Sequence, residues 1–226
     1  MKKLILCGVL ALSMLGVQSC RKDDNGGGDT PTPPPTPTLT SKVTYDGQDY
    51  QLDTTAAQVT GNQEGQVVGF TIQDANGNDI TATRWIISSW NGDLDNIQNS
   101  ENYAETIVYV PVDGQDIVHP QDAQTIYGAG FGLFAGNATE PVDLGDISAV
   151  TLNIESAAYP EQGSEAPGTI KYTASVEAAK PVEVSFNGDF YGPYIYKLPA
   201  EEGGSRRAPK SIDRTVVNLK DLKLAK

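Results

Sequence analysis

The chain has 226 residues, of which 38% are hydrophobic, 8% aromatic and 20% charged. This length has room for one β-rich domain or two very small ones, which excludes a large multidomain machine. The 23 glycines and 14 prolines indicate many turns and few long helices. Acidic residues outnumber basic ones by 29 to 16, for a net charge of −13. Because such a surface repels phosphate groups, nucleic acid is not expected as a partner.

The first twenty residues have the parts of a lipoprotein signal peptide. Lys2 and Lys3 form a cationic start, and residues 4–17 are an apolar run interrupted only by glycine and serine. The run is too short to span a bilayer as a helix, but it suits the apolar region of a signal peptide. The Val-Gln-Ser-Cys that ends at Cys20 resembles a lipobox, in which a small residue precedes the cysteine that becomes acylated. We therefore expect cleavage after residue 19 and lipid attachment at Cys20; cleavage by an ordinary secretory peptidase is the alternative.

Cleavage would change both the charge and the cysteine content. Removing residues 1–19 takes two lysines and no acidic residue, which leaves 14 basic and 29 acidic residues and a net charge of −15. The only other cysteine, Cys7, lies in the segment that is removed. The mature chain is therefore expected to have no disulfide, no zinc–thiolate site and no cysteine nucleophile.

A short charged motif follows the expected lipid site. Lys22, Asp23 and Asp24 resemble the export signal of surface lipoproteins of the Bacteroidetes. The resemblance covers about the first 25 residues, and it implies an outer-membrane protein that faces the extracellular side and contacts the membrane only through its lipid anchor. A solvated charge cluster at the chain end is the alternative.

Residues 20–40 predict a linker. Residues 26–38 contain only glycine, aspartate, threonine and proline, with five prolines between Pro31 and Pro37. A segment without apolar side chains has no core to bury, so we expect a disordered linker in which the prolines favour extended polyproline II. Fully extended, it would hold residues 41–226, the expected single module, up to about 60 Å from the membrane.

The module shows short segments rich in β-branched and aromatic residues between turn signals. Asp46-Gly47 separates two such runs and predicts a two-residue hairpin. Further strands are expected at residues 67–72, 80–90, 105–112, 125–134, 150–154, 169–177, 182–190 with a turn at 187–188, 194–198 and 215–224. Strands at this spacing predict an all-β fold, either an antiparallel β-sandwich or a jelly-roll-like domain.

Three glycines recur at every second position in one of these strands. Gly128, Gly130 and Gly132 would line one face of the strand, which predicts that a large ring from Trp85 or Trp90 covers it. The spacing does not match a dinucleotide-binding loop.

Few residues indicate catalysis. The only histidine, His119, precedes Pro120, which predicts an extended, solvent-exposed loop position. No G-x-S-x-G or H-E-x-x-H motif is present, so a serine hydrolase and a zinc enzyme are not expected. Two carboxylates from distant parts of the chain would suffice for glycan hydrolysis, which keeps that activity as an alternative.

One polar loop has the residue types of a calcium site. Side-chain oxygens recur in residues 91–101, where the candidate ligands are Asn91, Asp93, Asp95, Asn99 and Glu101. The pattern does not match an EF-hand, and a plain polar loop is the alternative. No other cofactor is expected.

Tyrosines close to a Gly-Pro pair form the candidate ligand site. Tyr191, Tyr194 and Tyr196 lie within six residues, and the last two share a face if the segment is a strand. Sugar rings stack on such aromatic platforms, whereas packing into the core is the alternative. We therefore expect a surface lipoprotein with a non-catalytic binding module for a glycan or an envelope protein. An adhesin or fimbria-like structural subunit is the first alternative, and a glycan hydrolase is the second.

Overall fold

The computed structural model describes residues 40–113, 118–160 and 166–198. These ranges contain ten strands and two short 3-10 helices, so the module is all-β. The expected signal peptide, the linker before residue 40 and the strand expected at 215–224 lie outside the described residues.

The elements follow the chain with short connections. The strands are β1 (Lys42–Tyr45), β2 (Gln48–Gln51), β3 (Thr54–Gly61), β4 (Gly69–Gln73), β5 (Asp79–Trp90), β6 (Tyr103–Pro111), β7 (Tyr127–Phe134), β8 (Ala149–Ala158), β9 (Gly168–Glu177) and β10 (Val182–Lys197). The 3-10 helices are η1 (Leu94–Asn99) and η2 (Pro120–Asp122).

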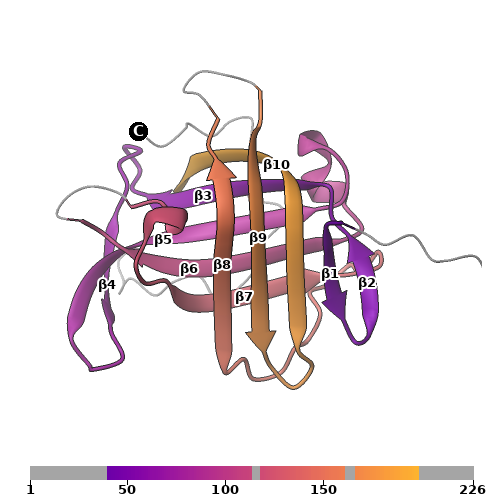
Figure 1. Ribbon diagram of the computed structural model, residues 1–226, viewed down its shortest axis with the longest axis horizontal. Helices are drawn as coiled ribbons and strands as arrows, with labels where there is room; N and C mark the ends of the chain where they lie inside the picture. The colour runs from indigo at the N-terminus through magenta and orange to yellow at the C-terminus, as the bar shows by residue number, and fades with distance from the viewer. Residues whose placement is uncertain (1–39, 114–117, 161–165, 199–226) are drawn as a thin grey trace, which may run out of the picture. The chain divides into compact units, whose positions relative to one another are not determined.

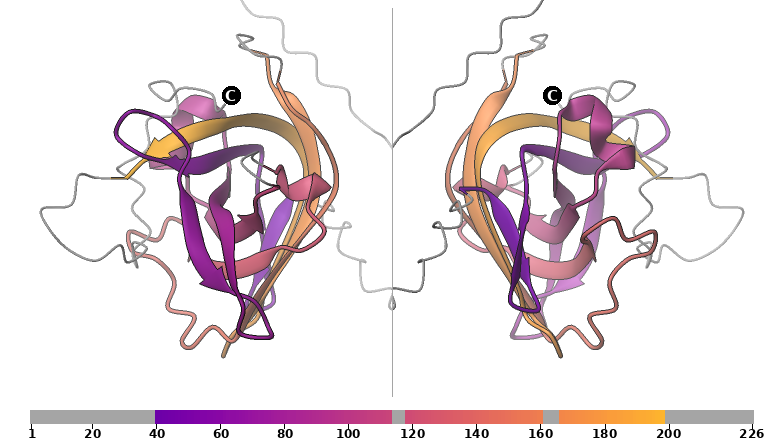
Figure 2. Two further views of the ribbon diagram at one scale, coloured as in Figure 1. Left: turned by 90° about the vertical axis from the view of Figure 1, so that its left-hand side faces the viewer. Right: turned by 90° about the vertical axis from the view of Figure 1, so that its right-hand side faces the viewer.

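The strands form two layers that cross each other (Figure 1). The front sheet has the order β2-β1-β10-β9-β8, and the back sheet has the order β10-β3-β5-β6-β7, with β4 beside the first part of β5. Strand β10 belongs to both sheets: residues 182–190 pair with β9, and residues 189–197 pair with β3. Figure 2 shows β10 curving from one layer over to the other.

The sheet is mixed in direction. Every strand pair is antiparallel except β10 with β3, which run parallel. The expected all-β sandwich is therefore confirmed, and its mainly antiparallel sheets contain one parallel pair. The cause of this pair is the passage of β10 into the back sheet, which brings it alongside β3.

Two turns were expected from dipeptides that contain glycine, and only one forms. Asp46 and Gly47 have φ values of 51° and 75°, which are required by the predicted hairpin between β1 and β2. Asn187 and Gly188 instead continue β10 and pair with Lys171 and Ile170 of β9. The pairing with β9 fixes them in an extended conformation, so the expected turn at 187–188 is wrong. The strand expected at 194–198 is the second half of the same β10.

Strand β3 was not expected from the sequence. Its eight residues, TTAAQVTG, are small or polar and show no clear alternation, yet all of them are buried. A strand that is buried throughout must be covered on both faces of its sheet.

The main core lies between the two sheets. It includes Trp85, Ile87, Phe186 and Phe190, and each of these is at most 1% exposed. Inside it, the hydroxyl of Tyr172 lies 2.6 Å from the Ser89 hydroxyl, and burial raises the pKa of Tyr172 to about 12. A smaller group, here called the outer cluster, lies on the outward face of the back sheet and consists of Ala56, Trp90, Ile97, Tyr103 and Phe134.

The glycine-rich strand β7 packs differently from the prediction. A Cβ on Gly128 would lie 2.0 Å from the carbonyl oxygen of Val150 in β8, so the close neighbour is backbone and not a tryptophan ring. At Gly130 the nearest side chain is that of Ile107. The pairing with β6 skips Ala129, and this bulge also ends the regular alternation of the glycines. The expected cover by Trp85 or Trp90 is therefore wrong at these two positions.

Candidate functional site

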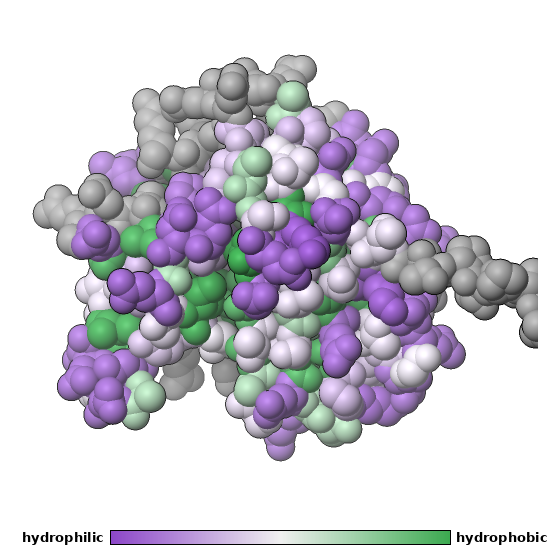
Figure 3. Space-filling model, in the orientation of Figure 1, coloured by the Kyte–Doolittle hydropathy of each residue, from purple (hydrophilic) through white to green (hydrophobic). Residues whose placement is uncertain are grey.

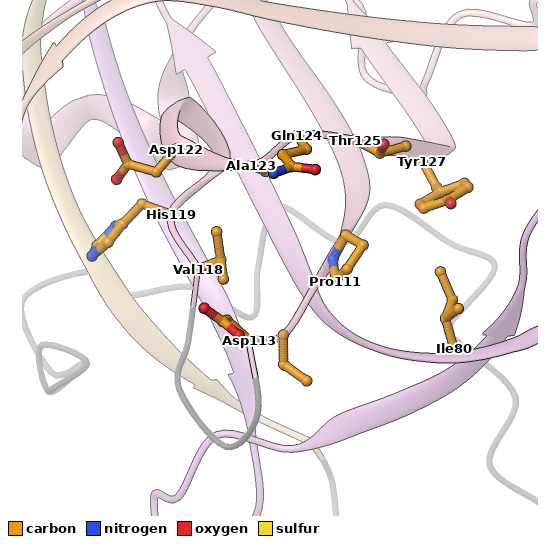
Figure 4. A pocket seen from close by; sticks show the side chains of 11 residues that line it. Ile80, Pro111, Asp113, Val118, His119, Asp122, Ala123, Gln124, Thr125 and Tyr127 are labelled. Atoms are coloured by element: carbon orange, nitrogen blue, oxygen red, sulfur yellow. The ribbon is translucent and has the colours of Figure 1, made fainter.

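A cavity of about 690 Å³ opens where β5 begins and β6 ends. Ile80 and Pro111 come from those two strands, η2 closes a second side, and Tyr127 comes from the start of β7. Figure 4 shows His119 and Asp122 on one side of the cavity and Tyr127 and Ile80 on the opposite side. Ile80 of β5 thus meets the end of β6 and the connection that leads through η2 to β7 around one space.

The walls of the cavity combine apolar and hydrogen-bonding groups. Ile80, Pro111 and Val118 supply apolar surface. Asp113, Asp122, Gln124 and Thr125 supply oxygen and nitrogen atoms for hydrogen bonds. Among the described residues that line it, two are acidic and none is lysine or arginine. The cavity therefore suits a neutral or cationic ligand and disfavours an anionic one.

A single short turn positions His119 and Asp122. Pro120 is the first residue of η2, where its fixed φ suits the helix and its missing N–H loses no hydrogen bond. His119 has φ −72° and ψ 144°, the extended conformation expected before proline. The amide of Asp122 donates to the carbonyl of His119 at 2.9 Å, which closes the turn.

His119 is half-buried, so the expectation of a solvent-exposed histidine is wrong. Its ring centroid lies 5.5 Å from that of Trp85 and 4.1 Å from that of Tyr159. Burial lowers the pKa of His119, while the charge of Asp122 acts in the opposite direction. Its Nδ1 atom is buried and has no hydrogen-bond partner within the described part of the chain. Pro120 restricts the backbone of His119 as expected. The aromatic neighbours of His119 lie far from it in the sequence, since Trp85 belongs to β5 and Tyr159 follows β8.

The loop that was considered for calcium is hydrogen-bonded to itself. Asp93 caps η1 by accepting from the amide of Asp95, and the side chain of Asn91 accepts from the amide of Asn102 at 2.7 Å. Asn99 ends η1, and the carbonyl of Glu101 accepts from Asn137. In residues 40–113, 118–160 and 166–198, no group of three or more His, Cys, Asp or Glu residues is arranged to hold a metal ion. Calcium binding by this loop stays a prediction.

The tyrosines of the expected sugar platform lie on the outward face of the back sheet. The pairing of β10 with β3 shifts between Tyr191 and Tyr194, so both side chains pack against the outer cluster although they are three residues apart. Tyr191, Tyr194 and Tyr196 are all half-buried. Burial raises the pKa of both Tyr191 and Tyr194. The segment is neither an open platform nor a fully buried core, and none of the three residues lines the cavity.

The polar residues that line the cavity were not predicted as site residues from the sequence. Asp113, Asp122, Gln124 and Thr125 lie in a connection without periodic hydrophobicity, where polar residues usually indicate only a loop. The one local signal in this connection was the pair His119-Pro120, because a proline restricts the residue before it to an extended conformation. The expected lipid site Cys20 and the export motif Lys22, Asp23 and Asp24 lie outside the described residues.

The surface seen from the side of the front sheet is mainly polar (Figure 3). Outward-facing residues of this sheet such as Asn153, Thr173 and Glu183 are exposed. In the described part of the chain, no helix has the length and apolar character needed to cross a membrane. In comparisons with known proteins, no protein family, no curated protein and no solved structure matches this chain.

Proposed function

We propose that this chain is an outer-membrane surface lipoprotein, anchored through Cys20, whose module binds a neutral glycan in the cavity beside η2 without catalysing a reaction. One observation carries the proposal: Asp122, Gln124 and Tyr127 bring hydrogen-bonding and ring surfaces into one cavity that has no lysine or arginine among its described lining residues. The volume of about 690 Å³ lies within the ~300–1,000 Å³ usual for small-ligand sites.

Each type of wall has a role in recognising a sugar. Aromatic rings such as those of Tyr127 and His119 accept the apolar C–H face of a pyranose. Carboxylates and the amide of Gln124 bind hydroxyl groups, and an ionised carboxylate accepts stronger hydrogen bonds than a neutral oxygen. Because burial keeps His119 mostly uncharged at neutral pH, its ring acts as a neutral wall. A cavity with these groups favours the binding of a glycan over that of a lipid or an anion.

The expected localisation at the cell surface supports the same role. A lipid at Cys20, the export motif at Lys22, Asp23 and Asp24, and the proline-rich linker would together hold the module outside the cell and away from the membrane. A site presented in this way meets extracellular polymers and other envelope proteins. An envelope protein that inserts a polar loop into the cavity is therefore the competing ligand.

The test is a glycan array probed with mature chain 20–226 carrying Cys20→Ser. We expect a defined neutral glycan to bind. Asp122→Asn should weaken the binding by about tenfold or more, since hydrogen bonds to charged groups contribute about 1.5–3 kcal/mol. Tyr127→Ala should also weaken it, because the ring on which the sugar stacks is lost. Asp146→Asn, an exposed aspartate that does not line the cavity, is the matched control. Binding that both cavity variants leave unchanged would exclude the cavity as the site.

A hydrolase is the second candidate, because Asp113 and Asp122 line the same cavity. Glycoside hydrolysis generally requires two carboxyl groups that flank the scissile bond. The glycan found on the array is incubated with the wild-type chain, and newly formed reducing ends are measured. Release that both Asp113→Asn and Asp122→Asn abolish would establish a hydrolase, whereas binding without release supports the non-catalytic function.

A structural subunit is supported by an edge strand. Strand β8 is ten residues long and pairs only with β9 in the described part of the chain. However, Glu155 forms a bulge in β8 and an ion pair with Lys171, and both features discourage pairing with a further strand. We therefore keep the adhesin or fimbria-like subunit as the alternative behind ligand binding.

A further inference from the structure

Part of the outward face of the back sheet carries buried side chains that belong to neither hydrophobic cluster of the described residues. Trp85 and Ile87 point into the main core, so Arg84 and Ile86 point outward. Ala56 belongs to the outer cluster, which places Gln58 and Thr60 of β3 on the same outward face. We call Gln58, Thr60, Arg84 and Ile86 the Arg84 face; they are 2%, 0%, 3% and 6% exposed, respectively.

The polar groups of the Arg84 face lack partners. The Oε1 of Gln58, the Oγ1 of Thr60 and the Nε and Nη1 of Arg84 are buried and have no hydrogen-bond partner within the described ranges. Only one other buried side-chain atom in those ranges, in His119, shares this condition. The charge of Arg84 acts on the Glu105 carboxylate and favours its ionised form, but the Nε and Nη1 atoms of Arg84 still lack acceptors among the described residues. Buried N–H groups without acceptors are unfavourable, so a native fold usually supplies them.

The apolar member of this face leads to the same conclusion. Ile86 is only 6% exposed, yet it belongs neither to the main core nor to the outer cluster. Near it, the Tyr103 hydroxyl donates to Glu105 at 2.7 Å. Burial raises the pKa of Glu105, while this hydrogen bond and the charge of Arg84 act in the opposite direction. Beside the Arg84 face, the outward side of the back sheet is occupied by the outer cluster together with Tyr191 and Tyr194. Neither hydrophobic cluster of the described residues therefore accounts for the burial of the Arg84 face.

The end of β10 identifies which part of the chain is near. Strand β10 runs parallel to β3, and the amide of Leu198 donates to the carbonyl of Gly61 at 3.0 Å. Gly61 directly follows Thr60, so Leu198, the last described residue before residues 199–226, lies beside the rim of the Arg84 face. These 28 residues reach about 90 Å when extended, and a sheet of five strands is only about 20 Å wide.

Charge complementarity favours the same segment. Residues 41–198 contain five basic and 22 acidic residues, a net charge of −17. Residues 199–226 contain seven basic and four acidic residues, a net charge of +3. The segment also carries the apolar side chains needed to cover a sheet, namely Ile212, Val216, Val217, Leu219, Leu222 and Leu224.

We propose that residues 199–226 dock on the Arg84 face of their own molecule. The apolar side chains of the segment cover Ile86, and its carbonyl or carboxylate oxygens accept hydrogen bonds from Arg84. The basic residues lie against the acidic module and are attracted by it. This intramolecular surface is independent of the glycan proposal, because it uses no residue that lines the cavity.

Paramagnetic NMR on the full mature chain tests the docking. Cys20→Ser and Asn218→Cys provide a single site for a spin label in residues 199–226. We expect the amide signals of Thr60, Arg84 and Ile86 to lose most of their intensity, while those of Asn153 and Thr173 on the front sheet keep theirs. Equal loss on both faces, or no loss on either, would overturn the proposal.

A mixed sample distinguishes docking within one molecule from contact between two copies. Isotope-labelled chain without spin label is combined with spin-labelled chain that carries no isotope. Signals that stay sharp at Thr60 and Arg84 in this mixture support the intramolecular contact. Loss of these signals in the mixture as well would show that a second copy occupies the face, which overturns the proposal.

Variants in the segment provide a control that leaves the described fold untouched. Val216→Asp with Leu219→Asp in the spin-labelled chain should restore at least half of the lost intensity at Arg84, because charged side chains cannot cover Ile86. Ser211→Asp, outside the apolar run, should restore little. Equal effects of the two substitutions, or none from the double variant, would contradict the proposed contact.

Discussion

The ring of His119 lies 4.1 Å from the ring of Tyr159, measured between centroids, with an interplanar angle of 50°. Tyr159 follows β8 in the front sheet, and its ring lies 5.3 Å from that of Phe190 in the main core. The ring of Trp85 in the back sheet has its centroid 5.5 Å from that of the imidazole. His119 lies in a connection between strands, but its ring, which lines the cavity, packs against Trp85 of the back sheet and against Tyr159, which follows a strand of the front sheet.

The titration of His119 follows from this packing. Burial lowers its pKa below the ordinary value of 6.5 because the charged imidazolium loses solvation. The folded state then binds a proton less readily than the unfolded state, so stability falls as the pH drops below about 6.5 and is unaffected by this group above it. The chain has one histidine, so a single imidazole Cε1–H signal reports the titration by NMR.

A variant isolates this contribution to stability. His119→Gln removes the titrating group, and we expect it to reduce the loss of thermal stability between about pH 7 and pH 5. The comparison uses the unfolding temperature of both proteins over that range. An NMR midpoint at or above 6.5, or parallel pH profiles for the two proteins, would contradict the prediction.

The contact between β7 and β8 predicts different effects for two neighbouring glycines. Gly128→Ala places a Cβ 2.0 Å from the Val150 carbonyl oxygen, and backbone cannot move aside cheaply. We expect a loss of about 1–3 kcal/mol in the free energy of unfolding, as for other overpacked sites. Gly130→Ala meets only the Ile107 side chain at 3.7 Å, an ordinary contact. It should therefore stay within about 0.5 kcal/mol of the wild type in urea unfolding.

Asp93 allows capping and calcium binding to be separated. Because its side chain accepts from the amide of Asp95, Asp93→Ala should cost about 1 kcal/mol of stability with or without a chelator. Asp93→Asn keeps a capping oxygen and should cost less. If the loop holds calcium, a chelator lowers the melting temperature of the wild type, and Asp93→Ala with Asp95→Ala removes that difference. A melting temperature that chelation leaves unchanged would exclude the calcium site.

Anchoring is tested at Cys20. Cys20→Ala should release the protein from membranes or leave it uncleaved, because two or three acyl chains give an essentially permanent anchor. Mass spectrometry of the mature N-terminus provides the direct measurement. A wild-type protein without acyl mass at Cys20 would exclude the lipoprotein assignment.

Export is a separate step with its own variant. Replacing Lys22, Asp23 and Asp24 by alanine should leave the protein acylated but facing the periplasm. Labelling of intact cells with a reagent that cannot cross the membrane should then decrease strongly. Unchanged labelling would show that these three residues do not direct the protein to the surface.

The sequence by itself determined the class of the fold and most of the strands. Runs of β-branched and aromatic residues predicted β5, β6, β8 and β9, and Asp46-Gly47 predicted the first hairpin, because these signals depend only on local backbone preference. The conformation of His119 was also predictable, since Pro120 restricts the residue before it.

Only the tertiary structure decided the remaining features. Asn187-Gly188 has the composition of a turn, but pairing with β9 along the whole segment outweighs that local preference. The small and polar residues of β3 do not themselves indicate a strand, and the strand is buried because neighbouring residues cover both of its faces. The cavity combines Ile80 of β5 with the connection between β6 and β7, and the Arg84 face combines side chains of β3 and β5. Such sites arise from long-range packing, which no local pattern of residue types encodes.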